Sequence, residues 1–206
     1  MFPRMKEGIA RASMAAEVRH RALSAAPGSF LRRKDFEGSD RAVESELSRL
    51  ALAGELTRVR RGIYHRGKPT RFGMTRPSVV EAALAVAGPG SGPAGVSAAH
   101  MLGLTTQVAG LVEIAVPGKV PEPMSGVRFR LRPFERRELR LEPIEVAVIE
   151  VLRDPIAVEA SDAAMRKRIA ELIAAGTVRA HLVANEIAEE RHLGARERWR
   201  RLELVA

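Results

Sequence analysis

Side chains of the kinds that contact nucleic acids gather in one short part of the sequence. The segment Ser39–Arg49 opens with short polar or charged residues, and the residues after it include two adjacent arginines before a glycine. Arginine can read guanine through O6 and N7, glutamate can accept a hydrogen bond from cytosine N4, and serine can pair with several bases. We therefore predict that Arg41, Glu44 and Ser45 face the bases of a DNA duplex.

Basic residues on either side of this segment are suited to the DNA backbone. Arginines that follow it could contact phosphates or a narrow minor groove, and the basic run before it could hold the flanking backbone. The alternative is that all these charges are solvated on an amphipathic helix and a hairpin edge. The full candidate DNA-binding set is Arg32, Arg33, Lys34, Ser39, Asp40, Arg41, Glu44, Ser45, Arg49, Arg58, Arg60 and Arg61.

A helix and a hairpin are predicted to position this set. Apolar residues recur at helical spacing from about Arg41 to Ala53, Ser39 or Asp40 is a good N-cap, and Gly54 can end the helix in a left-handed conformation. From residue 55 to residue 64 the period changes to two, with a plausible tight turn at Arg61-Gly62. This pattern predicts a helix followed by a two-stranded basic hairpin.

The preceding residues complete a recognisable order of elements. Residues 6–26 have helical periodicity and end at a Pro-Gly pair, and residues 30–36 could form a short buried piece with a small helix. Helix, short helix, helix and hairpin is the order of a winged helix. Residues 1–76 hold 17 Lys/Arg against 8 Asp/Glu, whereas residues 77–206 hold 17 of each. The entire net charge of +9 therefore lies in the first third, which favours a polyanionic partner there.

The rest of the chain predicts a second domain of mixed composition. A Gly/Pro-punctuated basic stretch at 67–77 indicates the boundary, which gives a DNA-binding domain at 1–72 and an effector domain at 77–206. Pro77 is a good first helical residue. Residues 111–116 and 127–131 read as strands, the second with Val127, Phe129 and Leu131 facing inward. Residues 162–204 read as helical, interrupted at Gly176 and Gly194. The expected fold class is α+β rather than repeated βαβ units.

Composition narrows the classes of function. The chain has no cysteine, so disulfides and thiolate metal sites are excluded, and no apolar run is long enough to span a membrane. No signal-peptide core is visible, and we expect a cytoplasmic protein without a cofactor or a metal. Ser97 and His100 lie three residues apart, but the sequence around Ser97 lacks the second glycine of a nucleophile elbow. We therefore do not expect an enzyme.

Two blocks of sequence resemble a known family. "GSFLRRKDF" followed by "LSRLALAGELTRVRRGIYHRG" looks like the N-terminal winged helix of AbiEi-type antitoxins from type IV toxin–antitoxin systems. The later block "SAAHMLGLTTQVAGLVEIAVPG" looks like the opening of the same family's C-terminal antitoxin domain. The resemblance covers about residues 8–152, and the helical tail at 162–204 is less distinctive.

The resemblance implies a function for each domain. In this family the N-terminal winged helix-turn-helix domain binds inverted repeats in its own promoter and represses transcription. The C-terminal domain counteracts a cognate toxin of the nucleotidyltransferase type. The resemblance thus implies double-stranded DNA and a toxin as partners, with the protein bound to DNA as a monomer or a dimer. A stand-alone regulator, or a protein-interaction module without a toxin partner, is the alternative.

Overall fold

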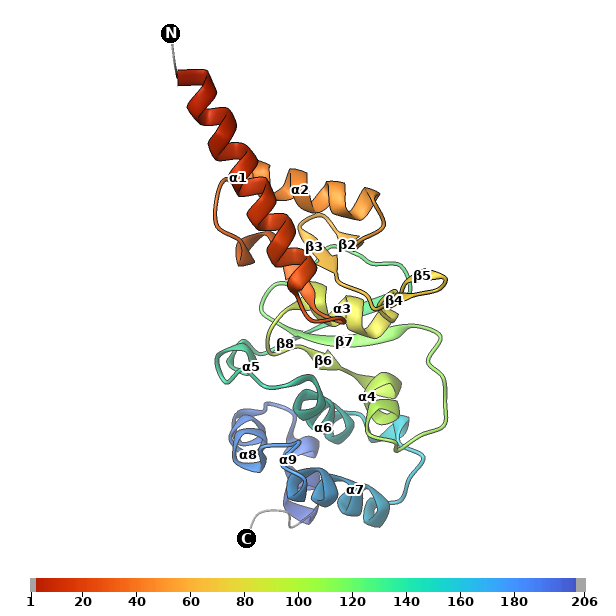
Figure 1. Ribbon diagram of the computed structural model, residues 1–206. Coiled ribbons are helices and arrows are strands. Elements are labelled where there is room, and N and C mark those ends of the chain that lie inside the picture. Colours follow the sequence, from red (N-terminus) through yellow and green to blue (C-terminus); the bar gives the residue numbers. More distant parts are fainter. Residues whose placement is uncertain (1–2, 203–206) are drawn as a thin grey trace. The chain divides into compact units, whose positions relative to one another are not determined.

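The computed structural model describes residues 3–202 and has two compact units, Met1–Val86 and Ala87–Ala206 (Figure 1). Both units combine helices with small sheets, so the α+β composition predicted from the sequence is confirmed. Within the described residues, no helix is both long and apolar enough to cross a membrane. Helix α3 lies mostly in the first unit, although the sequence analysis assigned its residues to the second domain.

The first unit, unit 1, contains two long helices, a 3-10 helix, a shorter third α-helix, a three-stranded sheet and a small hairpin. All strand pairs of the sheet are antiparallel, and the strand order is β1-β3-β2. The elements are α1 (Pro3–Ser24), β1 (Phe30–Arg32), the 3-10 helix η1 (Arg33–Asp35), α2 (Asp40–Leu52), β2 (Thr57–Arg60), β3 (Ile63–His65), β4 (Pro69–Thr70), β5 (Gly73–Met74) and α3 (Val79–Ala87).

Helix α2 forms where the sequence predicted it, with the predicted ends. The Ser39 side chain accepts a hydrogen bond from the backbone N–H of Ala42, and Gly54 has φ +75°, the left-handed conformation that glycine adopts without strain. Val43, Leu47 and Leu50 are fully buried in a core shared with α1 and the sheet. Burying a side chain of this size stabilises the fold by about 1.5–3 kcal/mol, which fixes the orientation of the opposite, polar face.

The hairpin of β2 and β3 has the predicted turn but not the predicted alternation. Arg61 and Gly62 form the turn, and Gly62 has φ +75°. The register shifts between Arg58 and Arg60, because Val59 forms a bulge opposite β3. Arg60 is consequently half-buried rather than fully outward, since a bulge re-aims the side chains that follow it.

The segment predicted as a basic linker contains structure of its own. Residues 69–74 pair as the β4–β5 hairpin, and α3 begins at Val79 rather than at Pro77. Ser78 caps α3 because its side chain accepts from the N–H of Glu81 while the Glu81 carboxylate accepts from the N–H of Ser78. A reciprocal cap of this kind explains the later start of the helix.

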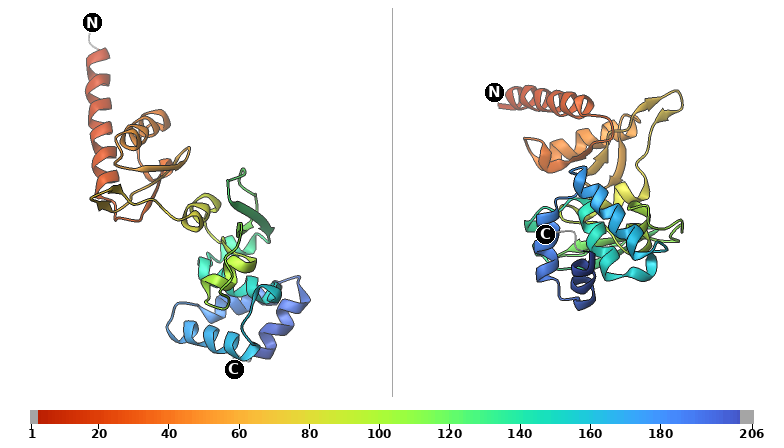
Figure 2. Two further views of the ribbon diagram at one scale, coloured as in Figure 1. Left: turned by 90° about the vertical axis from the view of Figure 1, so that its right-hand side faces the viewer. Right: turned by 90° about the horizontal axis from the view of Figure 1, so that it is seen from below.

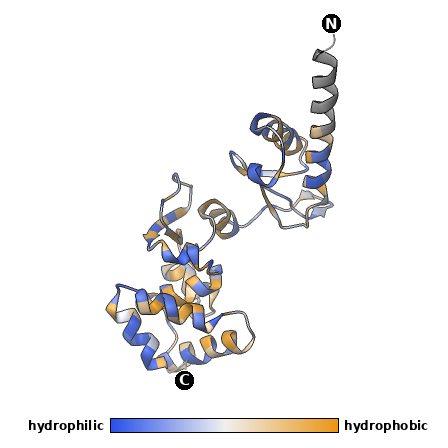
Figure 3. Ribbon diagram, turned by 90° about the vertical axis from the view of Figure 1, so that its left-hand side faces the viewer, coloured by the Kyte–Doolittle hydropathy of each residue, from blue (hydrophilic) through white to orange (hydrophobic). Residues whose placement is uncertain are grey.

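The second unit, unit 2, packs helices on a small sheet of order β6-β7-β8, in which β7 and β8 are parallel. The central helix α6 contributes an unbroken buried run from residue 145 to residue 152. Hydrophobic and hydrophilic residues alternate along the helices of this unit (Figure 3). Its elements are β6 (Gly92–Pro93), α4 (Gly95–Met101), β7 (Val112–Pro117), β8 (Val127–Arg132), α5 (Glu135–Glu138), α6 (Pro143–Arg153), the 3-10 helix η2 (Pro155–Ala157), α7 (Asp162–Ala174), α8 (Ala180–Glu189) and α9 (Leu193–Leu202).

Two details of unit 2 differ from the prediction. Leu131 was expected to face inward but is 58% exposed, because its neighbour Arg132, on the opposite face of β8, is the residue that pairs with Glu150 of α6. Gly194 was expected to interrupt the helical tail but lies inside α9, and the break falls at Glu190 and the two residues after it. The predicted interruption at Gly176 is confirmed, since α7 ends just before it.

A buried cluster of three arginines and three glutamates, the charge network, joins the elements of unit 2. Arg136 on α5 is fully buried, and its guanidinium donates to Glu150 at 2.6 Å, to Glu186 at 3.0 Å and to Glu190 at 3.2 Å. The two remaining arginines complete the network: Arg132 donates to both carboxylate oxygens of Glu150, and Arg153 pairs with Glu190.

Candidate nucleic-acid interface

Three elements of unit 1 meet at the N-terminus of α2. Arg33 of η1 forms an ion pair with Asp40, the first residue of α2. The backbone N–H of Arg33 also donates to the carbonyl oxygen of Gly62 in the β2–β3 turn, at 3.3 Å. The short helix, the start of α2 and the hairpin turn are therefore held side by side, although the turn is distant from the other two in the sequence.

Exposed cations project from each of these three elements. Lys34 on η1, Arg41 on α2 and Arg61 in the turn are exposed, and none has an ion pair or a side-chain hydrogen bond within residues 3–202. Unpaired cations carry their full charge to a ligand, because they need not break a protein contact first. We call these three residues the cationic trio. The positive end of the α2 dipole adds to their attraction for phosphate.

Glu44 is held by protein contacts rather than directed outward. The Tyr64 hydroxyl donates to its carboxylate at 2.9 Å, and Arg58 lies 3.8 Å away. Tyr64 itself is fully buried and also bonds the Ser48 hydroxyl at 2.9 Å. Burial raises the pKa of Tyr64, so its phenol stays protonated and remains a donor at neutral pH. Glu44 therefore helps to fix the sheet to α2. The base contact predicted for Glu44 from the sequence would be a second role.

We expect the substitution Tyr64→Phe to lower the free energy of unfolding by about 1 kcal/mol, because it removes the hydroxyl that links Ser48 and Glu44. Thermal unfolding followed by far-ultraviolet circular dichroism measures this change. Ser48→Ala is the matched control, since it removes one of the two hydrogen bonds and keeps the phenol. A Tyr64→Phe variant as stable as the wild type would contradict the assignment.

Two further members of the predicted set make contacts away from the cationic trio. The Arg32 guanidinium donates to the carbonyl oxygen of Ala85 in the last turn of α3, and Arg49 pairs with Glu46 at 2.7 Å. Ser45 is exposed on the outer face of α2, and Ser39 is engaged as the helix cap. The structure therefore brings together mainly the residues near the start of α2 and those of the hairpin turn.

The β4–β5 hairpin carries basic and aromatic residues that the sequence analysis did not single out. Its two turn residues are Arg71 and Phe72, and both are exposed. The Thr-Arg-Phe-Gly sequence offers a signal, because its glycine favours a tight turn. Their neighbours Lys68 and Arg76 are also exposed and basic.

Ser97 and His100 are the two residues that the sequence analysis considered for catalysis. The Ser97 hydroxyl accepts from the backbone N–H of Glu113 at 3.1 Å, and His100 is exposed. Helix α4 begins at Gly95, with Ala94 at the capping position, so Ser97 lies inside this helix. Among the described residues, no group of three or more His, Cys, Asp or Glu could hold a metal ion.

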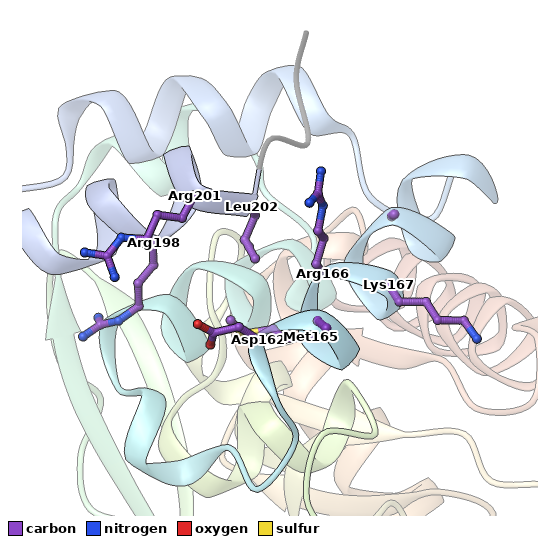
Figure 4. Close-up of a pocket in the computed structure, with 9 residues that line it drawn as sticks. Asp162, Met165, Arg166, Lys167, Arg198, Arg201 and Leu202 are labelled. Carbon is purple, nitrogen blue, oxygen red and sulfur yellow. The ribbon is translucent and has the colours of Figure 1, made fainter.

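The basic helical tail of unit 2 lines a pocket of about 470 Å³ between α7 and α9. Arg198 and Arg201 reach it from α9, Arg166 comes from α7, and Lys167 points away from the two α9 arginines (Figure 4). Arg198 donates to the carbonyl oxygen of Leu152, and Arg201 lies 3.9 Å from Glu197. These contacts give the α9 arginines roles within the fold.

Comparison with known proteins finds a distant structural similarity. No protein-family model and no curated protein matches the chain. Among solved structures, the chain is similar to the crystal structure of the RV2827C protein from Mycobacterium tuberculosis, with 16% sequence identity and a TM-score of 0.46. The match covers 94% of this chain and 76% of that chain. Proteins this distant need not share a function.

Proposed function

We propose that unit 1 is a winged helix-turn-helix that binds double-stranded DNA, with α2 as the recognition helix. The order α1, β1, η1, α2, β2 and β3, with β1 and β2 flanking β3, supports this assignment. It is the order of a winged helix in which the middle helix is reduced to a 3-10 turn. A recognition helix enters the major groove by its N-terminal residues, and in α2 these residues lie beside the other exposed cations.

The cationic trio is the observation that carries the proposal. Three unpaired cations lie on three elements that meet at one helix N-terminus, and the neighbouring hairpin adds more positive charge. Phosphate contacts of this kind position a protein on DNA, while Arg41 and Ser45 on the exposed face of α2 are available to bases. An ordinary solvated helix face would instead pair its charges or spread them.

We further propose that the protein is a cytoplasmic antitoxin and autorepressor of a type IV toxin–antitoxin operon. The motivation is the resemblance of residues 8–152 to AbiEi-type antitoxins, together with the net positive charge that lies entirely in the first third. Unit 2 would then counteract a nucleotidyltransferase-type toxin. A winged-helix regulator or protein-interaction module without a toxin partner is the second candidate, because winged helices also serve protein contacts.

Binding to its own promoter tests the DNA-binding proposal. Fluorescence anisotropy with the promoter and with an unrelated duplex of equal length, from about 50 to about 200 mM salt, separates specific from non-specific binding. We expect tighter binding to the promoter at every salt concentration and steep weakening with salt. Equal affinity for the two duplexes throughout would contradict operator binding.

Co-expression tests the antitoxin proposal separately. A neighbouring nucleotidyltransferase gene that arrests growth alone, and is neutralised by this chain, would support it. Neutralisation should survive substitution of the cationic trio by alanine, because the proposal assigns it to unit 2. Promoter binding without any such neighbour or neutralisation would favour the stand-alone regulator.

A further inference from the structure

The β4–β5 hairpin is held in one conformation by hydrogen bonds. The Thr70 hydroxyl accepts from the N–H of Phe72 at 3.2 Å and donates to the carbonyl oxygen of Gly73 at 2.7 Å. At its base, Lys68 and Thr75 exchange two hydrogen bonds, at 2.8 and 2.9 Å. A side chain at Gly67 would overlap the carbonyl oxygen of Thr75, so the base is also closely packed. Figures 1 and 2 show the hairpin projecting from the rest of unit 1.

The hairpin presents an exposed aromatic ring at its tip. Phe72 is 85% exposed, and the Arg71 guanidinium lies over its ring, 4.6 Å from the centroid. A phenylalanine contributes to stability mainly through burial, and an exposed ring on a rigid turn does nothing for this core. Phe72 is therefore placed to contact something outside the chain.

The charge around the ring indicates what that partner is. Residues 56–80 contain seven Lys/Arg and no Asp or Glu. A protein partner could meet an apolar ring, but a stretch of this charge without one acid is complementary to a polyanion. A phenylalanine between arginines is the arrangement by which DNA-bending proteins insert a wedge between base steps from the minor groove.

The position of the hairpin relative to α2 agrees with a duplex as the occupant. A groove of about 720 Å³ lies between the hairpin and the end of α2, with Leu52 and Phe72 as exposed apolar walls and Arg58 and Arg76 as basic ones. Leu52 follows Arg41 by eleven residues, which places both on one face of the helix. The hairpin thus stands beside the same exposed face that carries Arg41.

We propose that Phe72 is a wedge that inserts between base pairs of the minor groove while α2 occupies the adjacent major groove. Arg71 and Arg76 contact the phosphates on either side of the insertion point. The proposal rests on the proposed DNA binding of unit 1. It adds a contact of Phe72 with the minor groove to the contact of α2 with the major groove. Insertion is least costly at flexible TA or CA/TG steps, so the promoter site is expected to contain such a step beside the region read by α2.

Bending of promoter DNA tests the proposal with the full chain. Energy transfer between dyes at the two duplex ends measures the bend, and anisotropy measures affinity. We expect the wild type to bend the duplex and Phe72→Ala to bind it straight, with affinity lower by about tenfold. Phe72→Leu should retain the bend, because apolar wedges other than phenylalanine also insert. Arg71→Ala should reduce the salt slope by about 0.9.

Arg21→Ala is the matched control, because Arg21 on α1 also lies over a phenylalanine ring, that of Phe36, at 5.5 Å. It should leave bending and salt slope unchanged. A Phe72→Ala variant that binds and bends the promoter like the wild type would overturn the wedge and leave the proposed function standing. A wild type that binds no DNA would overturn the proposed function itself. A shift in oligomeric state on Phe72→Ala, with bending unchanged, would assign the hairpin to contacts between copies and also overturn the wedge.

Discussion

Replacing Lys34, Arg41 and Arg61 together by alanine is expected to weaken promoter binding on the order of a hundredfold at about 0.1 M salt. Each phosphate contact contributes about −0.9 to the slope of log affinity against log salt concentration. If Lys34 and Arg61 contact phosphates while Arg41 contacts a base, the triple variant loses about 1.8 from that slope. Between about 50 and 200 mM salt, the wild type should therefore weaken about 12-fold more than the variant.

A charge-matched control distinguishes local contacts from general attraction. Lys119, Arg191 and Arg200 are exposed cations of unit 2 without a protein ion pair in the described residues. Replacing these three by alanine removes the same net charge but should leave most of the slope in place. If both triple variants lost equal affinity and slope, binding would be diffuse, and the cationic trio would have no special role. The substituted side chains are exposed, so neither variant should change the melting temperature appreciably.

The sequence predicted α2 and its ends because their causes are local. A serine cap, a helical apolar period and a terminal glycine all act within one or two turns. The contact of η1 with the β2–β3 turn could not be predicted at this level, since the Arg33–Gly62 hydrogen bond joins segments that only the folded sheet brings together. The engagement of Glu44 by Tyr64 is non-local for the same reason.

The errors of prediction also have physical causes. The basic stretch after β3 looked like a linker because glycine, proline and charge are common in both linkers and tight hairpins. Strict alternation along β8 predicted an inward Leu131, but pairing with Glu150 makes the inward position of Arg132 favourable. Burial of an arginine is not predicted by hydropathy, because it depends on acids contributed by other elements.

The charge network of unit 2 gives the largest expected effect on stability. Substituting Arg136 by methionine is expected to lower the free energy of unfolding by about 3–5 kcal/mol. Methionine fills much of the arginine volume, so the loss comes mainly from three buried carboxylates deprived of a shared partner. Trp199 is the only tryptophan and lies in the core of unit 2, so its fluorescence during denaturant unfolding follows this unit selectively.

Acid should affect the network through its individual carboxylates. Hydrogen bonds and ion pairs with arginines lower the pKa of Glu150 and of Glu190 despite their burial. Their stabilisation is complete above the unfolded value of about 4.3 and is lost as pH falls through the lower folded values. Below about pH 4, the free energy of unfolding should fall more steeply for the wild type than for Arg136→Met. The difference in free energy of unfolding between the two proteins should therefore become smaller at acid pH.

Substitutions of Glu186 and Glu150 test whether the pairing geometry of the charge network determines how much each carboxylate contributes to stability. Burial raises the pKa of Glu186, and one of its carboxylate oxygens has no hydrogen-bond partner. Its charged form is therefore disfavoured in the fold, so Glu186→Gln should change stability at neutral pH by less than about 1 kcal/mol. Glu150→Gln should cost several times more, because Glu150 accepts hydrogen bonds from both Arg132 and Arg136. Equal effects of the two substitutions on the Trp199 transition would mean that burial alone, rather than the pairing geometry, determines the contribution of each carboxylate.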